Sequence, residues 1–241
     1  MNSEPGKPAA AKHTGVAAGI ATRVGSVGGF MLLEMVILLL AAGRLDWLWP
    51  WVYLGVCLVS MAVIGTITLR KSPETVAERA RPDRTKEWDR AIAILWLLLG
   101  YIALPLVAGL DARLAWTRGL GAGCNVGGAV VLAAGTGLTG WAMIANAYFS
   151  TAVRIQSDRG HTVCSTGPYR FVRHPGYVGY MLQTLGTALV LGSLWALIPG
   201  VVAVALMTVR TSLEDRMLQA ELPGYREYAQ QVRHRLVPGV W

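Results

Sequence analysis

Long runs of apolar residues, separated by short polar segments, organise this chain. Four runs are long enough to cross a bilayer, for which a helix needs about 20 residues. They cover residues 24–43, 50–69, 91–110 and 119–145. A fifth apolar region, 175–209, is interrupted at Gly192-Ser193, so we expect two short helices in a tight hairpin. The pattern therefore predicts an all-α, polytopic membrane protein with about six transmembrane helices.

Positive charge is concentrated on one side of the predicted helices. With a cytoplasmic N-terminus, the cytoplasmic segments are 1–23, 70–90, 146–174 and 210–241, and they contain 19 of the 22 Lys and Arg residues. Cytoplasmic loops of membrane proteins are enriched in these two residues. Both termini are therefore predicted to be cytoplasmic. Tryptophans near the opposite helix ends fit an interfacial aromatic belt: Trp47, Trp49, Trp51 and Trp116.

The composition excludes several other classes of protein. Hydrophobic residues make up 54% of the chain and charged residues 15%, whereas soluble chains average about 25% charged residues. The net charge of +8 lies between apolar runs, which indicates a membrane surface and not a nucleic-acid partner. The three cysteines have no metal-binding spacing, so no metal is expected.

Composition and polarity divide the chain into three regions. Residues 1–23 are rich in Ala, Gly and Lys and are predicted to be a disordered cytoplasmic tail. Residues 24–145 are predicted to form a four-helix transmembrane region. Residues 146–241 contain the predicted membrane hairpin and an amphipathic basic C-terminal helix that could lie on the bilayer. Small residues at a spacing of four are typical of close helix packing in membranes: Gly119, Gly123 and Gly127, and Gly128 with its neighbouring small residues.

The segment 154–180 reads RIQSDRGHTVCSTGPYRFVRHPGYVGY and is too polar to span a membrane. Its His174-Pro175 pair begins the next helix, where proline at the first position loses no hydrogen bond. The N–H groups of such a helix start can bind an anion such as a carboxylate. Arg170, Arg173 and His161 add donors nearby. A basic loop that only contacts lipid phosphates requires no histidine or tyrosine, so we expect a binding site.

Three charged residues of the predicted helices need an explanation. Arg210 and Glu214 are four residues apart on one helix face, and an ion pair between them is the simplest interpretation. Charge close to a membrane is costly, however, and tends to be kept for a partner. Glu34 lies near mid-bilayer, judged by the helical rise. We expect it to bond to a polar group on another helix, or to line a lipid entry path, and not to act as a catalytic base.

A longer pattern resembles a known family. GPYRFVRHPGYVGY, followed some 35 residues later by EDRML and GYREY, is similar to the isoprenylcysteine carboxyl methyltransferase and phospholipid methyltransferase superfamily. The resemblance is strong over 146–241. It extends weakly to SPETVAERARPDRTKEWDR, which looks like the loop of prokaryotic members. The sequence departs from the family pattern at two points. Asp215 stands where the family has Glu, and Pro223-Gly224 precedes Tyr225 at a slightly different spacing from the eukaryotic pattern. The resemblance therefore says less about the substrate than about the cofactor.

The resemblance implies methyl transfer from S-adenosylmethionine, with S-adenosylhomocysteine as product, in a helical membrane fold without a Rossmann domain. It implies a multi-pass protein of a prokaryotic cell membrane with its active site at the cytoplasmic face, in region 146–241. Arg210 falls on the family's arginine that faces the methyl acceptor, so it is the expected catalytic and substrate-binding residue. The cofactor-contacting positions fall on Gln156, His161, Thr162, Val163, Cys164, Tyr169, His174, Pro175, Gly176, Tyr177 and Glu214.

The acceptor remains open at this point. A lipophilic molecule that enters sideways from the bilayer is expected, and Arg210 favours an isoprenylcysteine-like carboxylate over a phospholipid amine. An amine would need a general base, and no dedicated candidate stands out. Two other classes compete: an NADPH-dependent sterol-type reductase, indicated by HPGY alone, and a transporter, indicated by six helices. A transporter commonly shows an internal repeat, and none is visible in the sequence.

Overall fold

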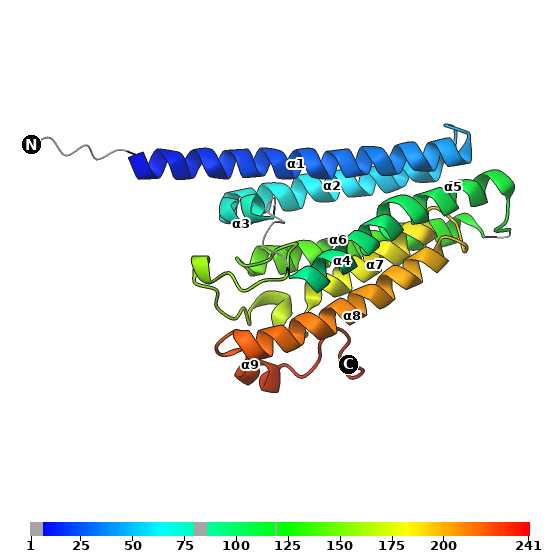
Figure 1. The fold of residues 1–241 in the computed structure, drawn as a ribbon. Coiled ribbons are helices and arrows are strands. Elements are labelled where there is room, and N and C mark those ends of the chain that lie inside the picture. The colour runs from blue at the N-terminus through cyan, green and yellow to red at the C-terminus, as the bar shows by residue number, and fades with distance from the viewer. Residues whose placement is uncertain (1–6, 80–85, 119) are drawn as a thin grey trace, which may run out of the picture.

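The computed structural model describes residues 7–79, 86–118 and 120–241, with only the backbone for residues 7–15 and Glu78. Within these ranges the chain forms helices and connecting loops and no β-strand, which confirms the predicted all-α class (Figure 1). The helices are α1 (Lys7–Ala42), α2 (Leu48–Lys71), α3 (Pro73–Glu78), α4 (Glu87–Leu98), the π-helix η2 (Leu99–Ala103), α5 (Leu104–Leu114), α6 (Ala122–Ala145), the 3₁₀ turns η3 (Ser157–Arg159) and η4 (Gly167–Arg170), α7 (Pro175–Val190), α8 (Leu197–Glu221) and α9 (Tyr225–Gln231).

Five helical segments of the described chain are long and apolar enough to cross a membrane. The sixth predicted crossing, α7, has only 16 residues. It forms the predicted hairpin with α8, which turns at Gly192 with φ of +68°, a left-handed conformation that glycine adopts without a Cβ clash. The five segments are Val16–Ala42, Leu48–Lys71, Glu87–Leu114, Ala122–Ala145 and Leu197–Glu221.

Two boundaries differ from the sequence prediction. Helix α1 begins at Lys7, so residues 7–23 are helical in the structure and not a disordered tail; alanine, which is frequent there, is the best helix former. Residues 1–6 lie outside the described residues. Helix α8 continues to Glu221 and does not end near 209, because no proline or glycine interrupts the chain before Pro223-Gly224.

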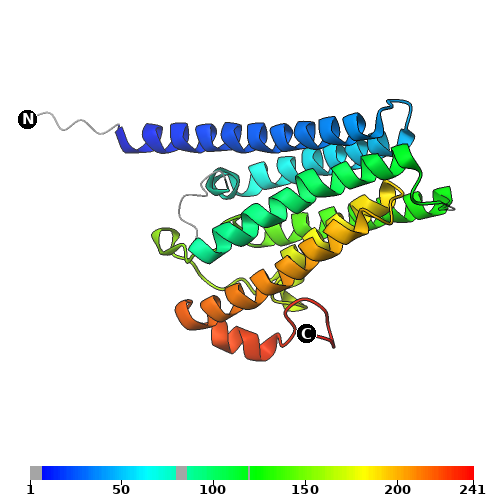
Figure 2. The same ribbon diagram turned by 45° about the vertical axis from the view of Figure 1, so that its right-hand side comes forward.

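The segments that connect the helices lie at the two ends of the bundle. The N-terminal end of α1, the start of α4 and the loop between α6 and α7 lie at the same end as α9 (Figures 1 and 2). These are parts of the segments in which Lys and Arg are concentrated. The hairpin turn between α7 and α8 lies at the opposite end, beside the short α1–α2 connection.

Helices α6 and α7 approach closely through glycines. A Cβ atom added to Gly128 of α6 would lie 2.3 Å from the backbone nitrogen of Val190. One added to Gly186 of α7 would lie 2.6 Å from the backbone nitrogen of Leu132. Packing of small residues allows such backbone approach in membranes, where no hydrophobic effect drives helices together. These two helices form the tightest contact of the fold.

The structure divides the glycines chosen from the spacing of four. Gly128 packs against α7, whereas around Gly123 and Gly127 no atom outside the helix's own backbone lies within 4 Å of an added Cβ. Gly119 lies outside the described residues. Because successive residues of a helix are about 100° apart, Gly127 and Gly128 point in different directions. The predicted role of glycine in packing is confirmed at Gly128 and is wrong for Gly123 and Gly127.

Glu34 is paired within the membrane-length helices. The hydroxyl of Tyr53 in α2 donates a hydrogen bond of 2.7 Å to the Glu34 carboxylate in α1. Both side chains are buried. The prediction that Glu34 bonds to a polar group on another helix is confirmed, and neither residue lines the cavity described below.

Candidate functional site

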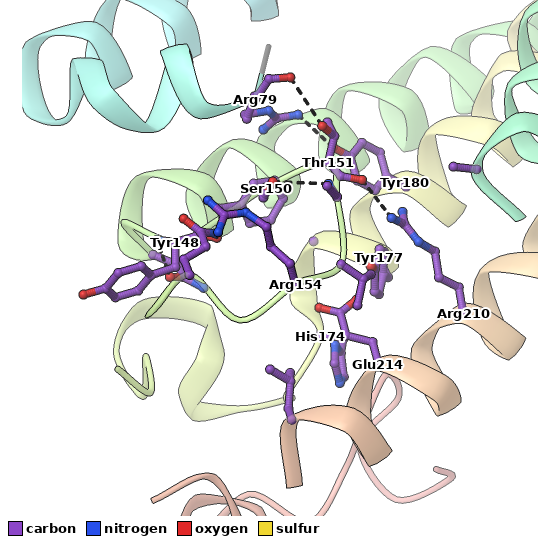
Figure 3. Close-up of a pocket in the computed structure, with 18 of the residues that line it drawn as sticks. Arg79, Tyr148, Ser150, Thr151, Arg154, His174, Tyr177, Tyr180, Arg210 and Glu214 are labelled. Carbon is purple, nitrogen blue, oxygen red and sulfur yellow. Dashed lines mark hydrogen bonds between the residues drawn. The ribbon is translucent and has the colours of Figure 1, made fainter. Parts of the chain in front are cut away.

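A cavity of about 460 Å³ lies at the end of the bundle that contains α9. Its volume is in the range of small-molecule sites, about 300–1,000 Å³. Its walls come from α1, the α4–η2 segment, the α6–α7 loop, the start of α7, and α8. Figure 3 shows the side of the cavity formed by the loop, α7 and α8. Of the residues predicted to form the site, all except Pro175 line the cavity: Gln156, His161, Thr162, Val163, Cys164, Tyr169, His174, Gly176, Tyr177, Arg210 and Glu214.

Asp215 anchors one wall of this cavity although sequence reasoning noted it only as a departure from the family pattern. Its carboxylate is fully buried. An ionised carboxylate has about four acceptor positions, and five side chains surround it, which ties α8 to the start of α7, to α9 and to the C-terminal segment. The contacts are Arg173 (2.7 and 3.0 Å), Gln219 (2.8 Å), Arg235 (2.9 Å), Tyr225 (3.1 Å) and His174 (3.3 Å).

The C-terminal segment holds the Arg173-His174 pair in place. The Arg173 side chain donates to the carbonyls of Val232 and Arg233, both at 2.8 Å. The backbone N–H of His174 donates to the Arg235 carbonyl at 2.9 Å. The start of α7 is therefore fixed by residues about 60 positions later in the sequence.

Helix α9 forms part of this support. It has seven residues, and its Tyr225 and Tyr228 side chains are buried in a cluster with Tyr169. The Tyr228 hydroxyl donates to the Tyr169 carbonyl at 2.7 Å. Burial raises the pKa of Tyr228, so the phenol stays protonated and can donate this bond. The predicted C-terminal helix thus packs on the protein by its aromatic face.

Arg210 pairs with Asp89 of α4. Its Nε and Nη2 atoms lie 2.5 and 3.0 Å from the two carboxylate oxygens, a bidentate geometry that gives the strongest ion pairs. Nη2 also donates to the Thr151 carbonyl at 2.8 Å. Both charged side chains are buried. Asp89 was missed because it is 121 positions away from Arg210 and no local pattern marks it.

The simplest interpretation of Arg210 and Glu214, an ion pair between the two, does not hold in the structure. Within the described residues Glu214 makes no ion pair, and its carboxylate instead accepts a hydrogen bond from the Tyr177 hydroxyl. The Tyr177 ring also lies 5.4 Å from the Arg210 guanidinium. Figure 3 shows Glu214 and Tyr177 on the side of the cavity formed by α7 and α8. Glu214 is therefore a cavity-lining carboxylate without a cationic neighbour in bonding distance.

Gln156 and His161 stabilise the loop that forms the opposite wall. The Gln156 amide donates to the Tyr148 carbonyl at 2.7 Å, and its oxygen accepts from Arg159 at 2.5 Å. Its backbone N–H donates to Nδ1 of His161 at 3.2 Å. Burial, together with the charges of Arg154 and Arg159, lowers the pKa of His161 to about 4. His161 is therefore neutral at pH 7, and its proton is on Nε2.

We expect acid to destabilise the protein through His161. Its pKa is about 4 in the folded state against an ordinary 6.5, so between these values the unfolded chain binds a proton that the folded chain does not. Stability then falls as the pH drops from 6.5 to 4. Thermal unfolding of wild-type protein and His161→Asn in detergent should show a difference in midpoint that shrinks across this window. A difference that is constant from pH 7.5 to 4.5 would contradict the assignment.

These features define a class: an integral membrane protein whose helical bundle encloses a cavity with apolar and charged walls at one end. The sequence model of the isoprenylcysteine carboxyl methyltransferase (ICMT) family matches residues 128–220. This range contains most of α6, the cavity loop, α7 and most of α8. The match confirms the resemblance to that family of membrane methyltransferases over this part of the chain.

Individual relatives match over shorter ranges. The cobalt-zinc-cadmium resistance protein CzcN of Cupriavidus metallidurans is 37% identical over 81 residues, which cover 32% of this chain and 37% of CzcN. The protein-S-isoprenylcysteine O-methyltransferase of Schizosaccharomyces pombe is 40% identical over 45 residues, 19% of either chain. The chain thus matches about a third of the first relative and about a fifth of the second. A solved structure of the eukaryotic intramembrane Ras methyltransferase ICMT aligns with a TM-score of 0.46 and 17% identity, covering 92% of this chain and 98% of the other.

Proposed function

We propose that the protein is an integral membrane methyltransferase that transfers a methyl group from S-adenosylmethionine to a lipophilic acceptor. One observation carries this proposal. The residues onto which the family resemblance maps the cofactor come from the α6–α7 loop, α7 and α8, and they line a single cavity. The site is proposed to face the cytoplasm of a prokaryotic cell, because the basic segments lie at the same end of the bundle.

The charged groups in this part of the cavity fit the cofactor. The Glu214 carboxylate, which has no cationic partner among the described residues, suits the ammonium or a ribose hydroxyl. The first turn of α7 carries no side-chain cap. Its Tyr177 and Val178 N–H groups donate to the His174 carbonyl, so the Gly176 N–H, beside His174, suits the carboxylate. Tyr169 and Tyr177 offer aromatic faces for the adenine. These residues would hold the cofactor from both ends.

Methyl transfer to an ionised acceptor requires no proton transfer by the protein. Bound S-adenosylmethionine would supply an electrophilic methyl group on its sulfonium. An acceptor that is already ionised attacks without a general base, so the chain contributes alignment, a dry site and positioned charge. The bidentate Arg210–Asp89 pair fixes α8 against α4, and neutral His161 adds a donor that does not titrate near pH 7.

The acceptor is proposed to reach the site from the bilayer. The cavity wall formed by α1 and the α4–η2 segment carries apolar and aromatic side chains beside Arg23, and it lies between membrane-length helices. Among acceptors we favour a carboxylate over a phospholipid amine, because arginines line the cavity and no base is placed for an amine. A reductase that uses NADPH is the second candidate, indicated only by the HPGY element.

Calorimetry on the purified protein in lipid nanodiscs tests this function. We expect S-adenosylhomocysteine to bind and NADPH not to bind. His174→Ala and Glu214→Ala should each weaken the binding of S-adenosylhomocysteine about tenfold, since each removes a hydrogen bond to a charged group of the ligand. Glu227→Ala, an exposed acid of α9 outside the cavity, is the matched control and should leave the affinity unchanged. Binding of NADPH without S-adenosylhomocysteine would reject the methyltransferase, and unchanged affinity in both cavity variants would reject the shared site.

A further inference from the structure

Three buried arginines line the cavity, and Arg79, unlike Arg173 and Arg210, has no carboxylate partner among the described residues. It follows α3 and is only 8% exposed. Its Nη2 atom donates to the Tyr180 hydroxyl at 3.1 Å, and its Nη1 atom points to the Met143 sulfur, a weak acceptor. Its guanidinium lies 5.0 Å from the centre of the Phe149 ring. Within the described part of the chain no acid pairs with it, which is unusual because buried charges are normally paired.

Two donor atoms at this point lack an acceptor. Nε of Arg79 and Nε1 of Trp96 are shielded from solvent, and neither has a hydrogen-bond partner among the described residues. Both side chains line the cavity, and both contact Tyr180, whose ring centre lies 5.7 Å from that of Trp96. Arginine and tryptophan side chains can only donate hydrogen bonds. Both nitrogens are closed to solvent as the structure has them, so a ligand that satisfies both must bring acceptor atoms and draw the two side chains toward the cavity.

The surroundings indicate that this ligand is anionic and carries an apolar part. Arg23 of α1 also lines the cavity and interacts electrostatically with Arg79, so two positive charges face this half of the cavity. Phe30 and Tyr101 form the adjoining wall and pack against each other in a tilted arrangement with ring centres 5.1 Å apart. This half of the cavity thus combines uncompensated positive charge with an aromatic surface between α1 and η2.

Arg210 differs from Arg79 in this respect. Two of its nitrogen atoms are committed to Asp89 and Thr151, so its charge is already neutralised by a buried carboxylate. A substrate anion would have to compete with Asp89 for the same donors. Figure 3 shows the two arginines entering the cavity from different sides, Arg79 near Tyr180 and Arg210 from α8.

We propose that Arg79 and Trp96 bind the oxyanion of the lipophilic acceptor, a carboxylate or a phosphate on an apolar tail, in the half of the cavity lined by α1, α4 and η2. This inference rests on the proposed function, which assigns the other half of the cavity to S-adenosylmethionine. Under this proposal Arg79, and not Arg210, recognises the charge of the acceptor. Arg79 lies outside the range 128–220 that the family model matches. Arg210 then acts as a positioning residue.

Binding measurements with simple amphiphiles test the site without activity. The probes are dodecanoate, dodecyl phosphate and uncharged dodecanol, titrated into wild-type protein and Arg79→Gln in nanodiscs of a zwitterionic lipid. We expect Arg79→Gln to lose about tenfold or more in affinity for at least one anion, since hydrogen bonds to charged groups are the strong ones. The affinity for dodecanol and for S-adenosylhomocysteine should not change. Arg70→Gln, an exposed arginine at the end of α2 outside the cavity, should bind all probes as wild type does.

The outcomes separate the possibilities. A loss confined to dodecanoate supports a carboxylate acceptor, and a loss confined to dodecyl phosphate supports the same site with a lipid phosphate. Equal affinity of wild type and Arg79→Gln for both anions overturns the proposal. If Arg79→Gln does not fold, two other variants test the site. Weakened anion binding by Trp96→Phe, together with retained anion binding by Arg79→Lys, supports the proposal. Unchanged anion binding by Trp96→Phe overturns it. A wild type that binds the anions but not S-adenosylhomocysteine would reject the proposed function and leave the anion site standing.

Discussion

Replacing Asp215 with Ala is expected to abolish the binding of S-adenosylhomocysteine and to destabilise the protein severely. Asp215 is fully buried and accepts hydrogen bonds from Arg173, Tyr225 and Arg235. Its loss leaves the buried Arg173 guanidinium without a counter-charge. Breaking such a buried pair by removing one partner costs about 3–5 kcal/mol. The free energy of unfolding should fall by this amount in a denaturant titration in detergent.

Two controls isolate the role of Asp215. Asp215→Glu retains the charge and matches the residue that the family has at this position, so we expect it to recover part of the stability and part of the ligand affinity. Asp46→Ala removes an exposed acid that pairs with Arg44 at 2.9 Å near the other end of the bundle. Exposed ion pairs contribute little to the free energy of unfolding, so Asp46→Ala should have the stability and the ligand affinity of the wild type. An Asp215→Ala protein with wild-type stability and affinity would show that the contacts around this carboxylate do not hold the site together.

Much of the site could be predicted because its residues are close together in the sequence. The cavity loop, the His174-Pro175 helix start and Glu214 lie within about 60 residues, and the hairpin of α7 and α8 brings their ends to one side. A hairpin of antiparallel helices requires this proximity whatever the detailed packing. The sequence also predicted the class of fold, because apolar length and the distribution of positive charge depend only on the membrane.

The partners of the buried charges could not be predicted in the same way. Asp89 reaches Arg210 and Arg79 reaches Tyr180 across more than 100 positions each. Any carboxylate in the polar loops was an equally good candidate for Arg210 by sequence alone. The choice depends on how α4 packs against α8, and helix packing in a membrane depends on shape and small residues more than on polarity. The sequence patterns and the family resemblance together therefore named residues that line the cavity, but not the ion pairs that shape it.

The same limit applies to the glycines of α6, and it gives the second large expected effect. Gly128→Ala should prevent α6 and α7 from packing, because the new Cβ would lie 2.3 Å from the Val190 nitrogen and 2.5 Å from the Leu189 carbonyl carbon. These are backbone atoms, which cannot rotate away as a side chain can. Overpacking costs about 1–3 kcal/mol where side chains can adjust, so a backbone clash should cost at least the upper part of this range. Thermal unfolding in detergent and the yield of folded protein measure the effect.

The neighbouring residue provides a matched control within the same helix turn. Gly127→Ala makes the same chemical change one position earlier, where no atom lies within 4 Å of the new Cβ. Because alanine is favoured over glycine in a helix by about 1 kcal/mol, Gly127→Ala should be neutral or slightly stabilising. The two variants share composition, helix propensity and membrane depth, so a difference between them reports only the contact with α7. Similar stability for both variants would show that α6 and α7 do not approach each other at Gly128 as the structure has them.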